Sequence, residues 1–216
     1  RRRHTRFRNV TGVQTCALPI SLGSARLQGV DAVKMIGAGL SLKLNRVAGA
    51  TKVLVWNQAE LSAAGVTLTA DDPTFQIGGT VGLSIADVVY ANATVSVGRS
   101  LVSNVVNPDG GAALSGDLLS VSITQAALFI GSGVSLNETL GSAGYGTVGT
   151  PGTDAVGFSV SNASLKLGIF TSGVRKYTGL TATLGSARLQ GVDAVKMIGA
   201  GLSLKLNRVA GATKVL

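Results

Sequence analysis

Residues 158–168 read FSVSNASLKLG, and this stretch decides the fold class. Apolar and small polar residues alternate in it, which is the period-two pattern of a strand with one buried face. The alternation changes phase at Asn162, because Val160 occupies an even position whereas Ala163 and Leu165 occupy odd ones. A straight strand would turn half of this apolar set into water after such a slip. The stretch therefore predicts two strand segments joined at Asn162 by a corner or a bulge.

The same motif recurs along the chain. NATVSVG begins at Asn92 and QAALFIG begins at Gln125, each preceded by a similar change of phase. Before NATVSVG, Tyr90 occupies an even position whereas Val95 occupies an odd one, so a corner or bulge is expected to turn both to the same face. Related but more diverged copies, GAGLSL and AAGVTL, begin at Gly37 and Ala63. We therefore expect corners or bulges at Asn92 and Gln125 as well as at Asn162.

Glycine and polar residues separate the strand-like runs. Asn107-Pro-Asp-Gly-Gly111 is a strong turn signal, and residues 141–152 have the composition of a loop. No sustained helical periodicity is present. The sequence predicts an all-β protein, an elongated and repetitive structure that is β-solenoid-like, in which each repeat buries its apolar face on its neighbours. A β-sandwich for each repeat unit is the alternative.

A long exact repeat sets the domain organisation. The segment from Leu22 to Leu54 recurs without a single change from Leu184 to Leu216, and it is here called the duplicated segment. Either a recent duplication or an assembly effect explains this identity. We expect residues 21–183 to be one β-rich repeat unit and residues 184–216 to be the truncated start of the next identical unit. One unit is long enough for a domain with its own core.

Residues 1–20 differ in character from the rest of the chain. Residues 10–20, VTGVQTCALPI, resemble the in-frame translation of a short-read sequencing adapter, and residues 1–6, RRRHTR, resemble the primer region that precedes it. This resemblance implies that residues 1–20, here called the adapter-like segment, are a disordered artefact. The only histidine and the only cysteine of the chain, His4 and Cys16, lie inside this segment.

The basic charge of the chain comes from the same two anomalies. The formal net charge is +9, of which the adapter-like segment supplies +5 and the second copy of the duplicated segment supplies +4. One period, residues 22–183, contains nine basic and nine acidic side chains. Because a neutral unit lacks the basic patch that nucleic-acid binding requires, we expect no nucleic-acid partner.

The composition excludes several kinds of chemistry from residues 21–216. Catalytic triads with histidine, Cys-His pairs and typical zinc sites are excluded, since neither histidine nor cysteine occurs there. We predict no catalytic, cofactor-binding or metal-binding residue. Calcium is the one metal for which the sequence offers candidate oxygens, in residues 107–111 and 152–154, but both fragments lack the regular glycine and aspartate spacing of calcium-binding β-repeats. Trp56 and Tyr177 are expected at the edge of a core, with a binding groove as the alternative.

The style of the repeats, for which FSVSNASLKLG is the best example, resembles the repeat modules of very large bacterial secreted or surface proteins, many of them adhesin-like. The resemblance implies an extracellular or cell-surface location and a non-catalytic role as a stalk or adhesive spacer. The implied partners are neighbouring repeats and a surface or glycan ligand. We expect no membrane-spanning segment, because no apolar run approaches the roughly 18 residues that a spanning helix needs. The alternative is a carbohydrate-binding or carbohydrate-active unit in which Asp71, Asp72 and Asp87 line a groove.

Overall fold

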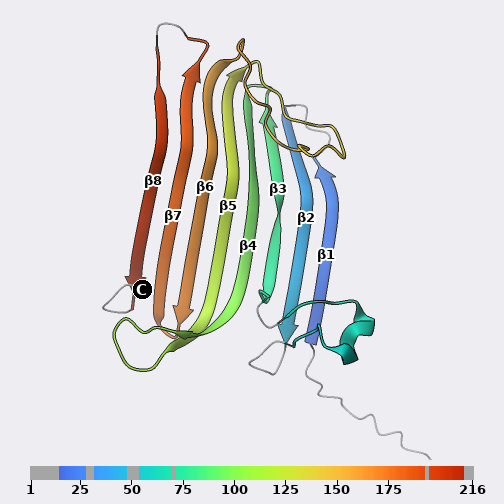
Figure 1. Ribbon diagram of the computed structural model, residues 1–216, viewed down its shortest axis with the longest axis vertical. Coiled ribbons are helices and arrows are strands. Elements are labelled where there is room, and N and C mark those ends of the chain that lie inside the picture. The colour runs from blue at the N-terminus through green and yellow to red at the C-terminus, as the bar shows by residue number, and fades with distance from the viewer. Residues whose placement is uncertain (1–14, 28–31, 48–53, 70–71, 193–194, 212–216) are drawn as a thin grey trace, which may run out of the picture.

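The computed structural model describes residues 15–27, 32–47, 54–69, 72–192 and 195–211. These residues form one open antiparallel sheet in which each strand pairs with the next one along the chain (Figure 1). The strands are β1 (Thr15–Arg26), β2 (Val33–Val47), β3 (Phe75–Ile85), β4 (Val89–Val105), β5 (Leu114–Ser132), β6 (Val156–Ser172), β7 (Arg175–Gln190) and β8 (Ile198–Ala210). A short 3-10 helix, η1 (Ala59–Ala64), lies between β2 and β3. The all-β prediction is confirmed, whereas the solenoid arrangement is not.

Two of the three predicted irregularities are present as bulges. Gln125 and Asn162 have left-handed φ angles of +52° and +53°, and the register between β5 and β6 shifts around them. A left-handed residue that opens a bulge turns the following apolar residues back to their original face. The strands continue through these bulges over 17 to 19 residues, so no corner divides them.

The prediction for Asn92 is wrong. β4 keeps a constant register with β3 past Asn92, and the shift that β4 shows against β5 at this point comes from the extra residue Gln125 on β5. The sequence pattern assigned Tyr90 to the same face as Val95, but Tyr90 lies on the opposite face, where it is buried in a small core of its own. Because this core buries Tyr90 on the face opposite Val95, β4 needs no bulge to turn Tyr90 to the side of Val95.

Part of the adapter-like segment has regular structure. Thr15–Ile20 form the first half of β1 and pair with β2 from Val47 to Leu42. The expectation of disorder is therefore wrong for these six residues, because a neighbouring strand supplies backbone hydrogen bonds whatever the side chains are. Residues 1–14 lie outside the described part of the chain.

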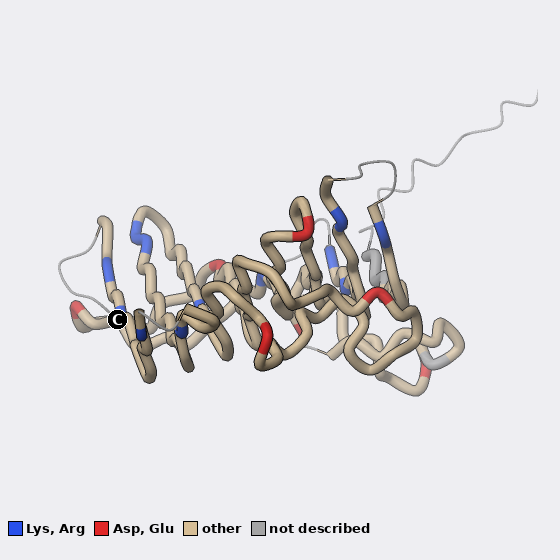
Figure 2. The backbone as a smooth tube through the Cα atoms, turned by 90° about the horizontal axis from the view of Figure 1, so that it is seen from above, with Lys and Arg blue, Asp and Glu red and all other residues tan. Residues whose placement is uncertain are grey.

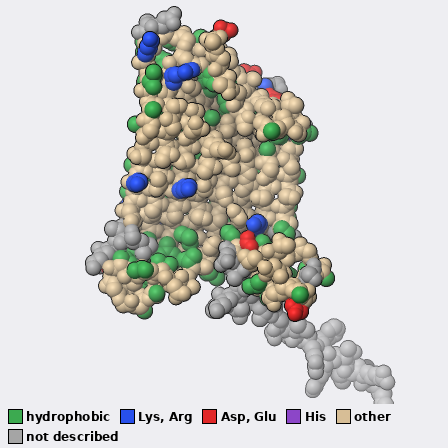
Figure 3. All heavy atoms as spheres, in the orientation of Figure 1, with side chains coloured by type: hydrophobic (Ala, Val, Ile, Leu, Met, Phe, Trp, Pro, Cys, Tyr) green, Lys and Arg blue, Asp and Glu red, His purple; other side chains and the backbone are tan. Residues whose placement is uncertain are grey.

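The two faces of the sheet differ. The polar face carries Ser, Thr and Gly in its middle, where Figure 3 shows few hydrophobic side chains, and it has a hydrophobic cluster at each end. Three segments pack at the ends of this face: residues 54–69, residues 106–113 and residues 133–155 (Figure 1). The opposite face, here called the apolar face, carries Val, Leu, Ile and Ala. Seen from above, the strands form a single layer (Figure 2).

All buried residues of the strands belong to the polar face. One cluster contains Ile36, Tyr90 and Phe129 beneath Leu136 and Ala155 of the 133–155 segment. The other contains Leu114, Phe170 and Tyr177, with the two rings stacked 6.0 Å apart. Tyr177 therefore lies within a core, whereas a position at the edge of a core was expected. Between the clusters, hydroxyl pairs such as Ser161–Ser186 and Ser164–Thr183, each 2.7 Å apart, join neighbouring strands.

Candidate functional site

The two copies of the duplicated segment form the same hairpin at opposite edges of the sheet. In the first copy Leu22 pairs with Leu40 and Arg26 pairs with Ile36, and in the second copy the equivalent pairs are Leu184–Leu202 and Arg188–Ile198. The glycine at the third position of the GAGLSL motif is left-handed in both, with φ of +56° at Gly39 and +63° at Gly201. The same hairpin and register therefore form whether β3 flanks the second strand of the hairpin, as in the first copy, or β6 flanks its first strand, as in the second copy.

The outer edge of this hairpin is used in one copy and open in the other. β2 pairs with β3 from Val33–Ile85 to Leu44–Phe75. β8 has the same sequence as β2 and, within the described residues, pairs only with β7. An edge strand presents unpaired N–H and C=O groups that can accept another strand. The unpaired edge of β8 is the first candidate site. The strand that fits it is one equivalent to β3, because β3 pairs with the same edge of β2.

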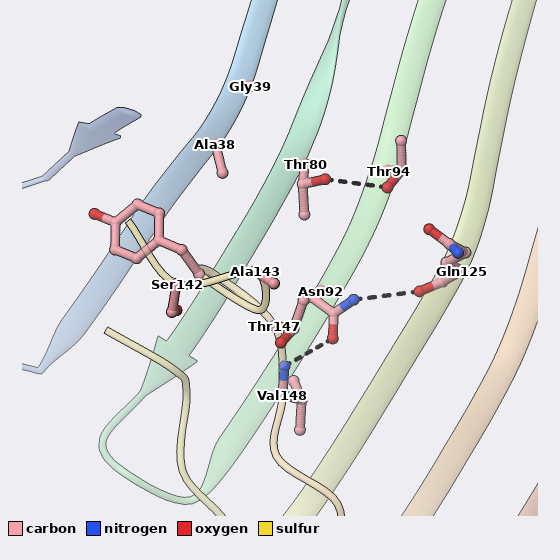
Figure 4. Close-up of a pocket in the computed structure, with 11 residues that line it drawn as sticks. Ala38, Gly39, Thr80, Asn92, Thr94, Gln125, Ser142, Ala143, Thr147 and Val148 are labelled. Atoms are coloured by element: carbon pink, nitrogen blue, oxygen red, sulfur yellow. Dashed lines mark hydrogen bonds between the residues drawn. The ribbon is translucent and has the colours of Figure 1, made fainter. Parts of the chain in front are cut away.

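A groove between the polar face and the 133–155 segment is the second candidate (Figure 4). Its volume is about 530 Å³, and its lining includes Ala38 from β2, Thr80 from β3 and Thr147 from the covering segment. All the lining side chains are uncharged. The groove can donate and accept hydrogen bonds but offers neither a general base nor an activated nucleophile.

Asn92 occupies the floor of this groove and fixes its cover. Its Oδ1 accepts a hydrogen bond from the N–H of Val148 at 2.9 Å, and its Nδ2 donates to the carbonyl of Gln125 at 3.2 Å (Figure 4). Thr80 and Thr94 pair beside it at 3.1 Å. The Asn that sequence analysis assigned to a corner thus binds the covering segment to the sheet.

An ion-pair cluster lies at the end of the sheet where β3 turns into β4. Lys34 contacts Asp87 at 3.2 Å and Glu138 at 3.4 Å, and Arg26 contacts Glu138 at 2.7 Å. The hydrogen bond from Lys34 to Asp87 and the charge of the two carboxylates raise the pKa of Lys34. Burial raises the pKa of the neighbouring Tyr90 phenol, which donates to the Asp87 carbonyl at 2.8 Å. These contacts attach the 133–155 segment to the first hairpin.

Two of the three acidic residues of the alternative carbohydrate-active interpretation, Asp72 and Asp87, are described by the structure, and they are not brought together. Asp72 precedes β3 and Asp87 follows it, so about 35 Å of extended strand separates them at about 3.3 Å per residue. Paired catalytic carboxylates lie roughly 5–10 Å apart. Asp72 accepts hydrogen bonds from the N–H and hydroxyl of Thr69 at 2.8 and 3.0 Å, and the backbone bond lowers its pKa. Asp71 lies outside the described residues.

A buried asparagine at the other end of β2 escaped the sequence analysis. Asn45 is fully buried, donates to the Leu54 carbonyl at 3.0 Å and accepts a bond from the Trp56 indole at 3.3 Å. Nearby, Lys43 contacts Asp72 at 3.1 Å. The available signal was an asparagine at the end of an alternating apolar run, which indicates a polar contact. Trp56 is half-buried and serves this contact.

The first of the two fragments with candidate calcium oxygens, residues 107–111, is held by contacts within the protein. Asn107 Oδ1 accepts bonds from the Asp109 N–H and from Arg175, which closes the predicted turn. Within the described residues, no three His, Cys, Asp or Glu side chains lie close enough together to hold a metal ion. In that same part of the chain, no helix has the length and apolar content needed to cross a bilayer. No protein-family model, curated protein or solved structure matches the chain.

Proposed function

We propose that this chain is a structural repeat module whose units join edge to edge into one continuous antiparallel β-sheet. The observation that carries the proposal is that the two identical copies of the duplicated segment form the same hairpin, in the same register, at both edges of the sheet. Where one unit ends in β8, the next unit supplies the strand that β3 supplies to β2. The module is non-catalytic, and its partners are neighbouring copies of itself.

Geometry and charge support this role. From β2 to its equivalent β8 there are six strand positions, so each unit adds about 29 Å at about 4.8 Å per strand. A period of residues 22–183 carries equal numbers of acidic and basic side chains, so a long array accumulates no net charge. Such an array is an elongated repetitive β structure, in keeping with a stalk or adhesive spacer in a large extracellular bacterial protein.

The alternative function is a glycan-binding module on the same scaffold. Its support is the uncharged, hydroxyl-bearing groove beside Asn92, which suits neutral hydrogen bonding. Its carboxylates are separated along β3, so a hydrolytic version has no paired acids among the described residues.

Electron microscopy of chains with two, four and eight tandem copies of residues 22–183 tests the proposal. We expect particles of constant thickness whose length grows by about 29 Å for each added unit. Separate bodies joined at variable angles, or a different increment, would contradict it. As a matched control, β2 of one internal unit, which is equivalent to β8, carries Leu42→Pro and Leu44→Pro, because proline cannot complete a central ladder. The control should interrupt the particle at that position alone.

A further inference from the structure

The apolar face of the sheet has no cover within the described residues. A single row of paired residues crosses it through six consecutive strands: Leu42, Ile77, Val97, Val121, Leu167 and Leu180. The next row includes Val95, Ile123 and Leu165. All are side chains that other sheets bury, yet every buried strand residue lies on the opposite face.

Charged side chains on the apolar face are confined, among the described strand residues, to one border. By register, Arg46, Lys176 and Arg208 also lie on this border. Arg99 and Asp117 form an ion pair of 3.0 Å there, and their contact raises the pKa of Arg99. The lysines near the middle of the sheet, Lys166 and Lys205, lie on the polar face in register with Thr181. The centre of the apolar face is therefore flat, neutral and hydrophobic.

We propose that two copies of this chain pack these apolar faces against each other as a β-sandwich. The face measures roughly 1,200 Å², since seven strand intervals are about 4.8 Å each and even the 11-residue β3 extends about 36 Å. A stable interface needs only about 800 Å² from each partner. Isolated soluble proteins seldom expose apolar patches beyond a few hundred Å².

A second copy of the chain is the occupant that this surface fits best. Aligned sheets pack about 10 Å apart through side chains from both inner faces, and branched Val, Leu and Ile suit this packing. Neutral apolar rows meet without placing a charge against the partner, and the Arg99–Asp117 border stays at the rim. The contact uses a face, whereas the proposed joining of units uses an edge, so either can exist without the other.

Sedimentation analysis of the full chain under reducing conditions tests this proposal. We expect a dimer, and we expect Leu165→Asp with Leu167→Asp to weaken its association by at least about 1,000-fold. The matched control is Ser164→Asp with Lys166→Asp, which alters the same strand on its polar face and should leave the dimer unchanged. A chain that is monomeric at all concentrations, or equal losses in both variants, would overturn the proposal.

A second measurement covers the case in which the Asp variants do not fold. In a Cys16→Ser background, Val97→Cys should react with a maleimide at least 10-fold more slowly in concentrated than in dilute protein. Ser96→Cys, one residue away on the polar face, should react at the same rate in both. Equal concentration dependence at the two positions contradicts the proposal. Flotation of the monomer with neutral phosphatidylcholine vesicles would also overturn it, because the face would then bind lipid.

Discussion

The two copies of the duplicated segment share sequence, hairpin and register but differ in burial. Ile36 is 0% exposed, whereas its equivalent Ile198 is 75% exposed. Asn45 is buried beside the 54–69 segment, whereas Asn207 is exposed. Local sequence therefore determines the hairpin, and segments distant along the chain determine which of its side chains become core. Because the two copies are chemically identical, each is the natural control for the other.

The largest difference is expected at the buried isoleucine. Ile36→Ala removes a side chain clustered with Tyr90, Phe129 and Leu136 and should lower the free energy of unfolding by about 3 kcal/mol. Ile198→Ala should lower it by less than about 0.5 kcal/mol, since its side chain is already in water. Urea unfolding of both variants provides the measurement. Similar losses would show that the 133–155 segment does not distinguish the copies.

The second largest loss of stability is expected at Asn45, near the end of β2. Asn45→Ala leaves the Leu54 carbonyl and the Trp56 indole without their partner, which should cost about 2 kcal/mol. The emission of Trp56, the only tryptophan, should shift to longer wavelength. Asn207→Ala is the matched control: because Asn207 is exposed, its substitution should cost less than about 0.5 kcal/mol and should leave the emission of Trp56 unchanged. An unchanged spectrum in Asn45→Ala would contradict the indole contact.

Glycine in the first strand of the hairpin should respond differently in the two copies. A Cβ on Gly185 would lie 2.7 Å from the Cβ of Asn162 on β6, whereas a Cβ on Gly23 would meet nothing within 4 Å. Gly185→Ala should therefore destabilise the protein by about 1–2 kcal/mol, and Gly23→Ala should be neutral or slightly stabilising. Thermal unfolding distinguishes these outcomes. Equal melting temperatures would contradict the close approach of Asn162 on β6 to Gly185 on β7.

The smallest effect concerns Asp72, which contacts Lys43 in the first copy. Its pKa is lowered in the folded state, so its contribution is complete above the unfolded pKa of about 3.9 and is lost as the pH falls through the lower folded value. At pH 7, Asp72→Asn should cost about 1 kcal/mol. In urea unfolding, this difference should be complete at pH 7 and should shrink as the pH is lowered below about 3.9. A difference that does not shrink with falling pH would exclude the carboxylate as its origin.

The sequence was informative about local structure. Alternation predicted the strands around Val121 and Leu165, and the changes of phase predicted the bulges at Gln125 and Asn162. Asn107–Gly111 formed the turn that its residue types indicated. These features depend on residues close together in the chain, so a local pattern is enough to indicate them.

The features that sequence could not supply depend on distant segments. Periodicity shows which residues share a face but not whether another layer covers that face, so Tyr90 was assigned to the wrong side and Asn45 was not noticed. The strand formed by Thr15–Ile20 also depends on a distant segment. The backbone groups of β2 can form hydrogen bonds with any extended backbone, whatever its side chains are. The candidate edge at β8 required knowledge that both copies take the same register.

Residue-resolved amide exchange of the second hairpin tests the joining of units most directly. The segment 184–216 is isotopically labelled in the present chain. A longer chain joins residues 1–183 to residues 22–183 and then to residues 22–216. In this longer chain, the label is placed on residues 22–54 of the second unit, which are equivalent to residues 184–216 and lie at the first junction. In the present chain, the outward amides of β8 should exchange rapidly. In the longer chain, we expect them to slow by at least about 100-fold, as they acquire the partner that β3 gives to β2. Unchanged exchange at these amides would contradict the account of the repeat as part of a continuous sheet.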